Sequence, residues 1–500
     1  MSAKRRLFSA SFIFAYMKSG KLLPLLLLLF TILISSCKKD ELITDSSAKL
    51  EFTTDSVLFD TVFHYAGSTT KVFKIRNTHS QPINISKAYL AGGTSSPFKL
   101  NIDGVPTTSS NPVLHDIEIL GGDSMYVFVQ VFVNPSGSMP ILIKDSVIFE
   151  TNGNIQDVKL TAIGQDVYLH KPDPGKFYSL LSSCTPCGPD TILPVDKPHL
   201  VFGYLVVDSA KRVIIPAGGK FYMHNHAVLW VYRDGTLEIQ GSKGNEVTFQ
   251  GDRTETEYKE VPGQWGKIWF SKLSKNNIID YAIIKNGGIG VQCDTVANST
   301  PTLRMSNTII KNMSAAAVFG QGAHIRAVNC LFYNCGQYLA ALTIGGNYSF
   351  IHCTFNGNWS GSEARTTPLL VMNNYYVSVG SALIVRPIDS CYFANCILHG
   401  DLGEEIGIDS TTVAGGGYFN YKFDYCILRT ARNVSADPFH YVVPYANADP
   451  GFANVSDQNY RPYAGSVNII NKGDTSIFIA KDLDGNLRTD GLPDLGAYER

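Results

Sequence analysis

Short apolar segments, each ended by Gly or polar turn residues, make up most of this chain. Patterns with apolar side chains at every third or fourth position, which would predict long amphipathic helices, are hard to find. Tyr, Phe and β-branched residues are plentiful, and these side chains favour strands. The pattern predicts an all-β fold, and 500 residues are enough for more than one domain.

Residues 49–168 predict the first domain. They contain six or more short strands at roughly 10–25-residue spacing, which is typical of a β-sandwich. The motif Phe73-Lys74-Ile75-Arg76-Asn77, followed by Pro82-Ile83-Asn84-Ile85, resembles the immunoglobulin-like domains of the sperm-protein and cilia-associated class. That resemblance implies a spacer or a docking platform.

From about residue 199 the segments become shorter and recur at a nearly even spacing. Subtracting the first positions of six similar segments gives steps of 26, 22, 23, 43 and 30 residues, and we interpret the 43 as two turns, one of them irregular. A period of roughly 22–26 residues indicates a solenoid, and a parallel β-helix fits the strand-like segments best. The six segments are 282–284, 308–310, 330–332, 353–355, 396–398 and 426–428.

Cys occupies the same place in four of the six segments: Cys330, Cys353, Cys396 and Cys426. Small, soft side chains stacked in successive coils fill a narrow interior, so we expect these thiols to be packed rather than to bind metal. The preceding position is often Asn, which predicts a partial ladder of amides bonded from coil to coil.

The closing segment, residues 441–500, contains Asp449-Pro450-Gly451-Phe452 and Asp494-Leu495-Gly496-Ala497-Tyr498-Glu499. It resembles the end of many bacterial right-handed parallel β-helix proteins. The resemblance implies that fold for 199–440 and its closing segment, but it does not imply one activity, because the extended family includes lyases, hydrolases and adhesins. The catalytic signatures of the pectin-hydrolysing members do not occur here.

Residues 169–198 are rich in Pro and predict a linker and cap. Cys184 and Cys187 form a CxxC within this interval. A redox motif would need a helix start in a βαβ setting, whereas the context here is a loop. A local disulfide or two free thiols is the interpretation that we favour.

The N-terminus predicts export. Lys18 and Lys21 precede an apolar run that ends just before Cys37, as in a secretory signal at residues 1–36. Small residues directly before Cys37 resemble the bacterial lipobox, which implies that Cys37 is acylated and that 37–48 is a tether. Both Met1 and Met17 remain possible start sites. We expect an outer-membrane lipoprotein, at the cell surface or on the periplasmic face.

Removing residues 1–36 removes five basic and no acidic residues, which takes the formal charge from −1 to −6. A nucleic-acid partner needs a basic face, so we expect none.

Catalytic candidates are few. Lys285 and Lys311 fall at equivalent coil positions and, with Arg386, could serve a polysaccharide lyase as a base and a carboxylate-binding cation; Arg326 and His352 could share their face. Another interpretation is that these cations only solvate the coil. Glycoside hydrolysis would need two carboxylates, for which one loop-rich stretch offers Asp389, Asp401, Glu404 and Glu405.

Two further interpretations concern ligands. Asp482, Asp484 and Asn486 resemble the start of a Ca²⁺ loop, but the closing Glu is replaced by Pro493, so we favour an Asx turn and no cofactor. Sugar rings could stack on Trp265, Trp269, Trp359, Tyr375 and Tyr376, although core packing explains these residues equally well.

The sequence therefore predicts a non-catalytic cell-envelope lipoprotein that binds a glycan or a partner protein along a β-helix face. The alternative is a polysaccharide lyase or glycoside hydrolase of the β-helix class, because function depends on the site and not on the fold.

Overall fold

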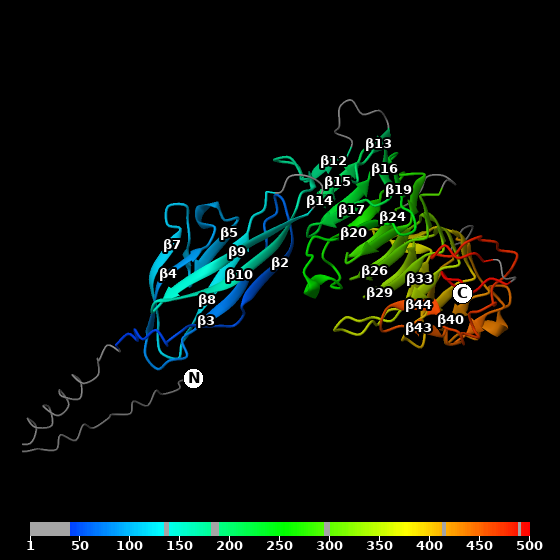
Figure 1. The fold of residues 1–500 in the computed structure, drawn as a ribbon. Helices are drawn as coiled ribbons and strands as arrows, with labels where there is room; N and C mark the ends of the chain where they lie inside the picture. Colours follow the sequence, from blue (N-terminus) through cyan, green and yellow to red (C-terminus); the bar gives the residue numbers. More distant parts are fainter. Residues whose placement is uncertain (1–40, 135–139, 182–189, 295–300, 413–416, 489–491) are drawn as a thin grey trace, which may run out of the picture. The chain divides into compact units, whose positions relative to one another are not determined.

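The computed structural model describes residues 41–134, 140–181, 190–294, 301–412, 417–488 and 492–500 (Figure 1). Cys37, Cys184 and Cys187 lie outside the described residues, so the predictions made for them stay predictions. Within these ranges, no helix is both long and apolar enough to cross a membrane. The regular structure is almost entirely β, with three short 3-10 helices in the described ranges: η1 (Gly93–Ser95), η2 (Thr256–Tyr258) and η3 (Val434–Ala436).

Contacts divide the chain into a sandwich unit and a coil unit, and the coil unit also takes in residues 58–69, 131–134 and 140–143. The sandwich has two five-stranded sheets, A and B. Sheet A is ordered β1 (Glu51–Phe52), β3 (Lys71–Arg76), β8 (Ser124–Val131), β5 (Phe98–Ile102) and β6 (Val105–Pro106). Sheet B is ordered β2 (Ser56–Phe63), β10 (Asn154–Gln165), β9 (Ile141–Thr151), β4 (Ile83–Leu90) and β7 (Val113–Ile119).

Alternation along the strands explains the sandwich. In β3, Phe73 and Ile75 are buried while Val72 and Arg76 are exposed. A strand turns successive side chains to opposite faces, so each sheet presents one apolar face to the core. The predicted sandwich is confirmed.

The coil is built from three parallel sheets, C, D and E. Each turn from β11 to β38 contributes one short strand to each sheet, the last turn has strands in sheets C and E only, and the strands of successive turns lie side by side (Figure 1). Sheet C contains β11 (Tyr168–His170), β14 (His199–Val201), β17 (Lys220–Met223), β20 (Val247–Gly251), β23 (Ala282–Lys285), β26 (Ile309–Met313), β29 (Leu331–Cys335), β32 (Thr354–Asn356), β37 (Ile397–His399), β40 (Ile427–Leu428) and β42 (Tyr445–Ala446).

Sheets D and E complete each turn. Sheet D contains β12 (Tyr178–Leu180), β15 (Tyr204–Val207), β18 (Val228–Val231), β21 (Lys267–Phe270), β24 (Ile289–Cys293), β27 (Ala316–Gln321), β30 (Tyr338–Thr343), β33 (Leu370–Asn373) and β38 (Ile406–Asp409). Sheet E contains β13 (Asp190–Ile192), β16 (Arg212–Pro216), β19 (Thr236–Gln240), β22 (Asn277–Asp280), β25 (Leu303–Ser306), β28 (His324–Val328), β31 (Gly346–Ile351), β36 (Ile388–Ala394), β39 (Phe419–Asp424) and β41 (Tyr441–Val442). Two antiparallel hairpins project from this scheme: β34 (Tyr375–Val377) with β35 (Leu383–Val385), and β43 (Phe452–Asn454) with β44 (Asn459–Pro462).

The predicted repeat is a set of neighbouring strands in sheet C, which confirms the β-solenoid. Ile283 pairs with Ile309, which pairs with Leu331. The interpretation of the 43-residue step as two turns is wrong, because Thr354 pairs directly with Ile397. One turn is enlarged instead, and it carries the β34–β35 hairpin. The first coil also begins earlier than residue 199, since β11, β12 and β13 already pair in parallel with β14, β15 and β16.

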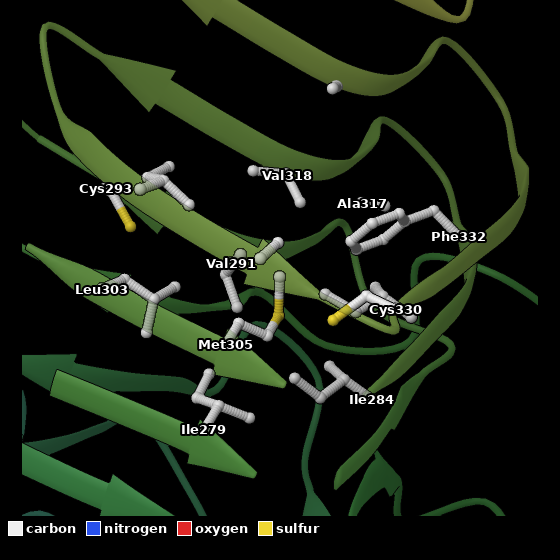
Figure 2. Packing of buried hydrophobic residues seen from close by; sticks show 14 of the residues in the cluster. Ile279, Ile284, Val291, Cys293, Leu303, Met305, Ala317, Val318, Cys330 and Phe332 are labelled. Carbon is white, nitrogen blue, oxygen red and sulfur yellow. The ribbon is translucent and has the colours of Figure 1, made fainter. Parts of the chain in front are cut away.

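The interior of the coil is apolar. Figure 2 shows side chains from successive turns, including Ile284, Cys330 and Phe332, meeting between the sheets. Cys330, Cys353, Cys396 and Cys426 are all buried at 0–1% exposure and free, as their alignment predicts.

The position before each repeat segment is a tight turn. All six residues there have φ between +46° and +52°, a region that Asn tolerates better than most residues. The Asn329 amide donates to Asn307 Oδ1 at 3.2 Å, and Asn395 bonds to His352 at 3.0 Å. The expected amide ladder therefore exists, and it stabilises the turn between sheets E and C.

The closing segment covers part of the outer face of sheet C. Leu331 and Tyr333 pack with Tyr460 and Leu483, and Ile397 packs with Leu495 in a neighbouring cluster. Towards the start of the sheet, on β20 and β23, Thr248, Gln250 and Lys285 are polar, half-buried side chains of the outer face. The site described next lies there.

Candidate functional site

Lys285 and Lys311 occupy paired positions on neighbouring strands of sheet C. Both side chains are half-buried on the outer face, and Lys311 in turn pairs with Tyr333 on β29. The sequence prediction that the two lysines are equivalent is confirmed.

Their surroundings differ. Lys311 Nζ lies 3.2 Å from Glu260 Oε2 and 2.9 Å from Gln458 Oε1. Glu260 also accepts from the Asn312 amide at 2.5 Å. Burial acts to raise the pKa of Glu260, but the bond from Asn312 and the charge of Lys311 leave that pKa lowered. Lys311 is therefore held in a closed, charge-balanced network.

Lys285 has no such network. Its ammonium makes no hydrogen bond or ion pair with any residue of the described ranges, and its backbone oxygen accepts from Trp265 Nε1 at 2.8 Å. Burial lowers the pKa of Lys285, the neighbouring charge of Lys311 lowers it further, and the charge of Glu260 opposes them only in part. The net effect disfavours the charged form of Lys285. Lys285 is therefore a cation without a bonded acidic partner among the described residues.

The loop between β20 and β21 forms the wall beside Lys285. The side-chain amide of Gln264 donates to Tyr258 O at 2.7 Å and Val261 O at 2.8 Å. The amide of Asn286 donates to Lys259 O at 2.9 Å. These bonds fix the loop against β23.

A hollow of about 220 Å³ opens between this loop and β20 and β23, within the coil unit. We call it the lysine hollow. Its lining includes Gln250, Arg253, Lys259, Gln264, Lys285 and Asn286. Asn286 Oδ1 and Gln264 Oε1 are buried and accept no hydrogen bond from the described residues. An unsatisfied buried acceptor costs about 1–3 kcal/mol, so a donor placed beside either oxygen would be favourable.

The other proposed cations lie elsewhere. Arg386 lies over the Tyr376 ring, 5.6 Å from its centroid, beside the β34–β35 hairpin. Arg326 is exposed on β28 of sheet E, and His352 is buried in a turn. The structure does not bring these three residues to Lys285 and Lys311.

The carboxylates of the loop-rich stretch are held apart from the lysine hollow. Glu405 is fully buried and forms a bidentate pair with Arg365. Glu404 accepts from Thr430 at 3.0 Å. Asp389 and Asp401 are exposed. Glu405 therefore serves the structure of this turn.

In the segment that resembles a Ca²⁺ loop, the two acidic side chains bond to other residues of the protein. Asp482 is buried and accepts from the backbone of Asn486 and Glu499, each at 2.7 Å. Asp484 pairs with Lys243 and Arg461, each at 2.5 Å. No group of three metal-ligating side chains occurs among the residues that the structure describes.

The aromatic candidates separate into core and surface. Trp265 is 2% exposed. Trp269 faces outward on sheet D and stacks on Trp230, with centroids 4.9 Å apart and an interplanar angle of 9°. Because each ring covers a face of the other, this pair favours coil-to-coil packing. Trp359, Tyr375 and Tyr376 are half-buried, and the Tyr375 hydroxyl bonds to Asp409 at 2.6 Å.

Sequence reasoning missed Glu260, Gln264 and Asn286. Asn286 carried a signal, because Asn286, Asn312 and Asn334 repeat at the same steps as the strands and all have positive φ. Glu260 and Gln264 carried none, since they lie in a loop without a repeat.

Comparisons with known proteins describe the architecture. No protein-family model matches the sequence, and no curated protein does. The PapD-like domain 7 of human CEP192 is similar at 13% identity, over 26% of this chain and 92% of that domain, with a TM-score of 0.16. The E. coli chaperone DraB is similar at 12% identity, over 23% of this chain and 54% of the chaperone, with a TM-score of 0.16.

The catalytic unit of a GH87 α-1,3-glucanase from Streptomyces thermodiastaticus is similar over 71% of this chain and 67% of its own length, at 8% identity and a TM-score of 0.28. These are likenesses of fold alone. The chain is an all-β protein in which a two-sheet β-sandwich precedes a β-solenoid of three parallel sheets.

Proposed function

We propose that this protein is a non-catalytic cell-envelope lipoprotein that binds a glycan through the lysine hollow. The observation that carries the proposal is the composition of the hollow: a cation that bonds to no acidic residue, Lys285, beside two amide residues, Gln264 and Asn286, whose carbonyl oxygens lack donors among the described residues. Sugar hydroxyls both donate and accept, so one sugar residue can serve all three groups.

A binding role is favoured over a catalytic one by the state of the nearest carboxylate. Glu260 is bound by Lys311 and Asn312, and its lowered pKa keeps it ionised. An ionised carboxylate cannot act as a general acid. No acidic residue lines the lysine hollow, so no carboxyl group stands beside Lys285 there as a partner for acid–base catalysis.

The envelope location is supported by the sequence alone. The signal-like segment before Cys37 and the small residues next to it favour lipid attachment. A lipid-anchored protein outside the cytoplasm meets extended polysaccharides, and solenoids commonly bind extended ligands along one face.

The test is affinity electrophoresis of the mature chain, carrying Cys37→Ser to remove the lipid, through gels that contain a panel of polysaccharides. We expect one or more glycans to retard the protein and Lys285→Gln to reduce the retardation at least tenfold. The matched control is Lys272→Gln, an exposed lysine outside the hollow.

The same mixtures are assayed for new reducing ends and unsaturated ends. We expect neither. Product that disappears with Lys311→Ala or Arg386→Ala would establish the lyase or hydrolase instead, and failure of every glycan to retard the protein would refute glycan binding.

A further inference from the structure

The charges around the lysine hollow have one sign. Arg253, Lys259 and Lys285 line it, and neither Asp nor Glu does. The imbalance suggests the charge of the ligand as well as its class.

The nearest carboxylates already bond to other residues. Glu255 lies 3.1 Å from Arg253 Nε and accepts from Thr69 at 3.1 Å. Glu260 is bound to Lys311 and Asn312. Neither carboxylate bonds to Lys285 or Lys259, so two of the three lining cations have no bonded counter-ion, and the charge of Glu260 acts on Lys285 only at a distance.

Lys285 is the better placed of the two. Lys259 is exposed at the rim, where water solvates its charge. Lys285 is half-buried, and Lys311 on the next strand repels it. Water screens such a group less, so an anion at this point gains more than it would at an exposed lysine.

From these contacts we infer that the glycan carries an acidic sugar residue, whose anionic group binds Lys285 while its hydroxyls donate to Asn286 and Gln264. The inference rests on the proposed function and adds the substrate class to it. Asn286 is 2% exposed, and its amide nitrogen is fixed on Lys259 O, so its carbonyl oxygen is held in place. This fixed acceptor lets the site distinguish an acidic sugar from a simple anion.

Size sets a further limit. The hollow measures about 220 Å³, below the roughly 300–1,000 Å³ of pockets that enclose larger ligands. It fits one sugar residue, with the rest of a chain lying outside. Tyr222 lines the same hollow and offers an apolar contact for the ring.

Isothermal titration calorimetry of the mature Cys37→Ser chain tests the inference. The probes are a uronic-acid oligosaccharide, the same oligosaccharide with its carboxyl groups reduced to hydroxymethyl groups, a sulfated oligosaccharide and inorganic sulfate. We expect an acidic oligosaccharide to bind at least tenfold more tightly than the reduced one. Lys285→Gln should remove that difference, and Lys272→Gln should keep it.

The two acidic probes identify the source of the charge, and tighter binding of either one than of the reduced probe supports the inference. Equal binding of the acidic and reduced probes would refute the acidic-sugar inference but leave glycan binding intact. Inorganic sulfate binding as tightly as the oligosaccharides would also refute it, since the site would then recognise an ion alone. Binding of none of the probes would refute the inference, and the polysaccharide panel then decides the proposed function separately. A thermal melt of Lys285→Gln that matches the parent excludes misfolding as the cause of lost binding.

Discussion

Lys285 and Lys311 lie side by side on neighbouring parallel strands, yet Glu260 pairs with Lys311 alone, at 3.2 Å. The two lysines occupy equivalent positions in the repeat. They differ because the loop that carries Glu260, which does not repeat, pairs with only one of them. One is a structural cation, and the other is available to a ligand.

The first prediction separates these roles by stability. Lys311→Gln removes the ion pair with Glu260 in a setting where the lysine side chain is only 14% exposed, so we expect the coil unit to lose about 1–2 kcal/mol in urea unfolding. Lys285→Gln removes a half-buried charge that has no partner and should cost nothing or stabilise slightly. Equal losses for the two variants would contradict the assignment.

The second prediction concerns acid. His352 is fully buried, accepts the amide of Asn395 at 3.0 Å and lies near the charge of Arg488. Burial, with the Arg488 charge, lowers its pKa to about 3. The unfolded chain binds a proton at about pH 6.5, and the folded chain does not. Above pH 6.5 the neutral His352 costs the folded chain nothing. As the pH falls from 6.5 towards 3, protonation of this histidine in the unfolded chain lowers the free energy of unfolding.

His352→Asn should remove that acid sensitivity without breaking the turn, because Asn307, Asn329 and Asn395 occupy the equivalent turns at similar positive φ. Between pH 7 and pH 5 the parent should lose about 2 kcal/mol more than the variant. Urea unfolding at the two pH values measures the difference. Parallel losses in both proteins would mean that His352 is protonated in the fold.

The coil was predictable because the same residue types recur at equivalent positions in successive turns. The Ile and Cys segments recur at the same place, and the Asn residues before them mark turns that need positive φ, so alignment alone found the sheet, the buried thiols and the ladder. The same argument put Lys285 opposite Lys311.

What the sequence did not predict depends on segments that occur once. The loop that carries Glu260 and Gln264 is fixed by contacts with Asn286 and Lys311, which no period reveals. The enlarged turn between Thr354 and Ile397 looked like two turns, because a long insertion and an extra coil have similar lengths. Arg386 was grouped with the two lysines in the sequence analysis only because it is a cation, and no repeat position supported that grouping.

The third prediction concerns the thiols. Burial raises the pKa of Cys330, Cys353 and Cys396 well above the usual value, and only thiolates alkylate quickly. Native iodoacetamide treatment followed by mass spectrometry should leave these three residues and the buried Cys426 unmodified, while denaturant should expose all four. Rapid native labelling of the set would place the thiols outside the coil.

The fourth prediction concerns attachment. Mass spectrometry of the mature N-terminus from membranes should find a lipid on Cys37, and Cys37→Ser should release the protein into the soluble fraction. An unmodified N-terminus elsewhere in the chain would contradict the lipoprotein assignment.

The most direct test of the account is a crystal structure of the mature chain in complex with an oligosaccharide from a polysaccharide that retards it. The account predicts an intact sugar chain with one residue in the lysine hollow, within hydrogen-bond distance of Lys285 Nζ and of Asn286 or Gln264. A sugar bound elsewhere, or a cleaved product beside Lys311 and Glu260, would contradict it.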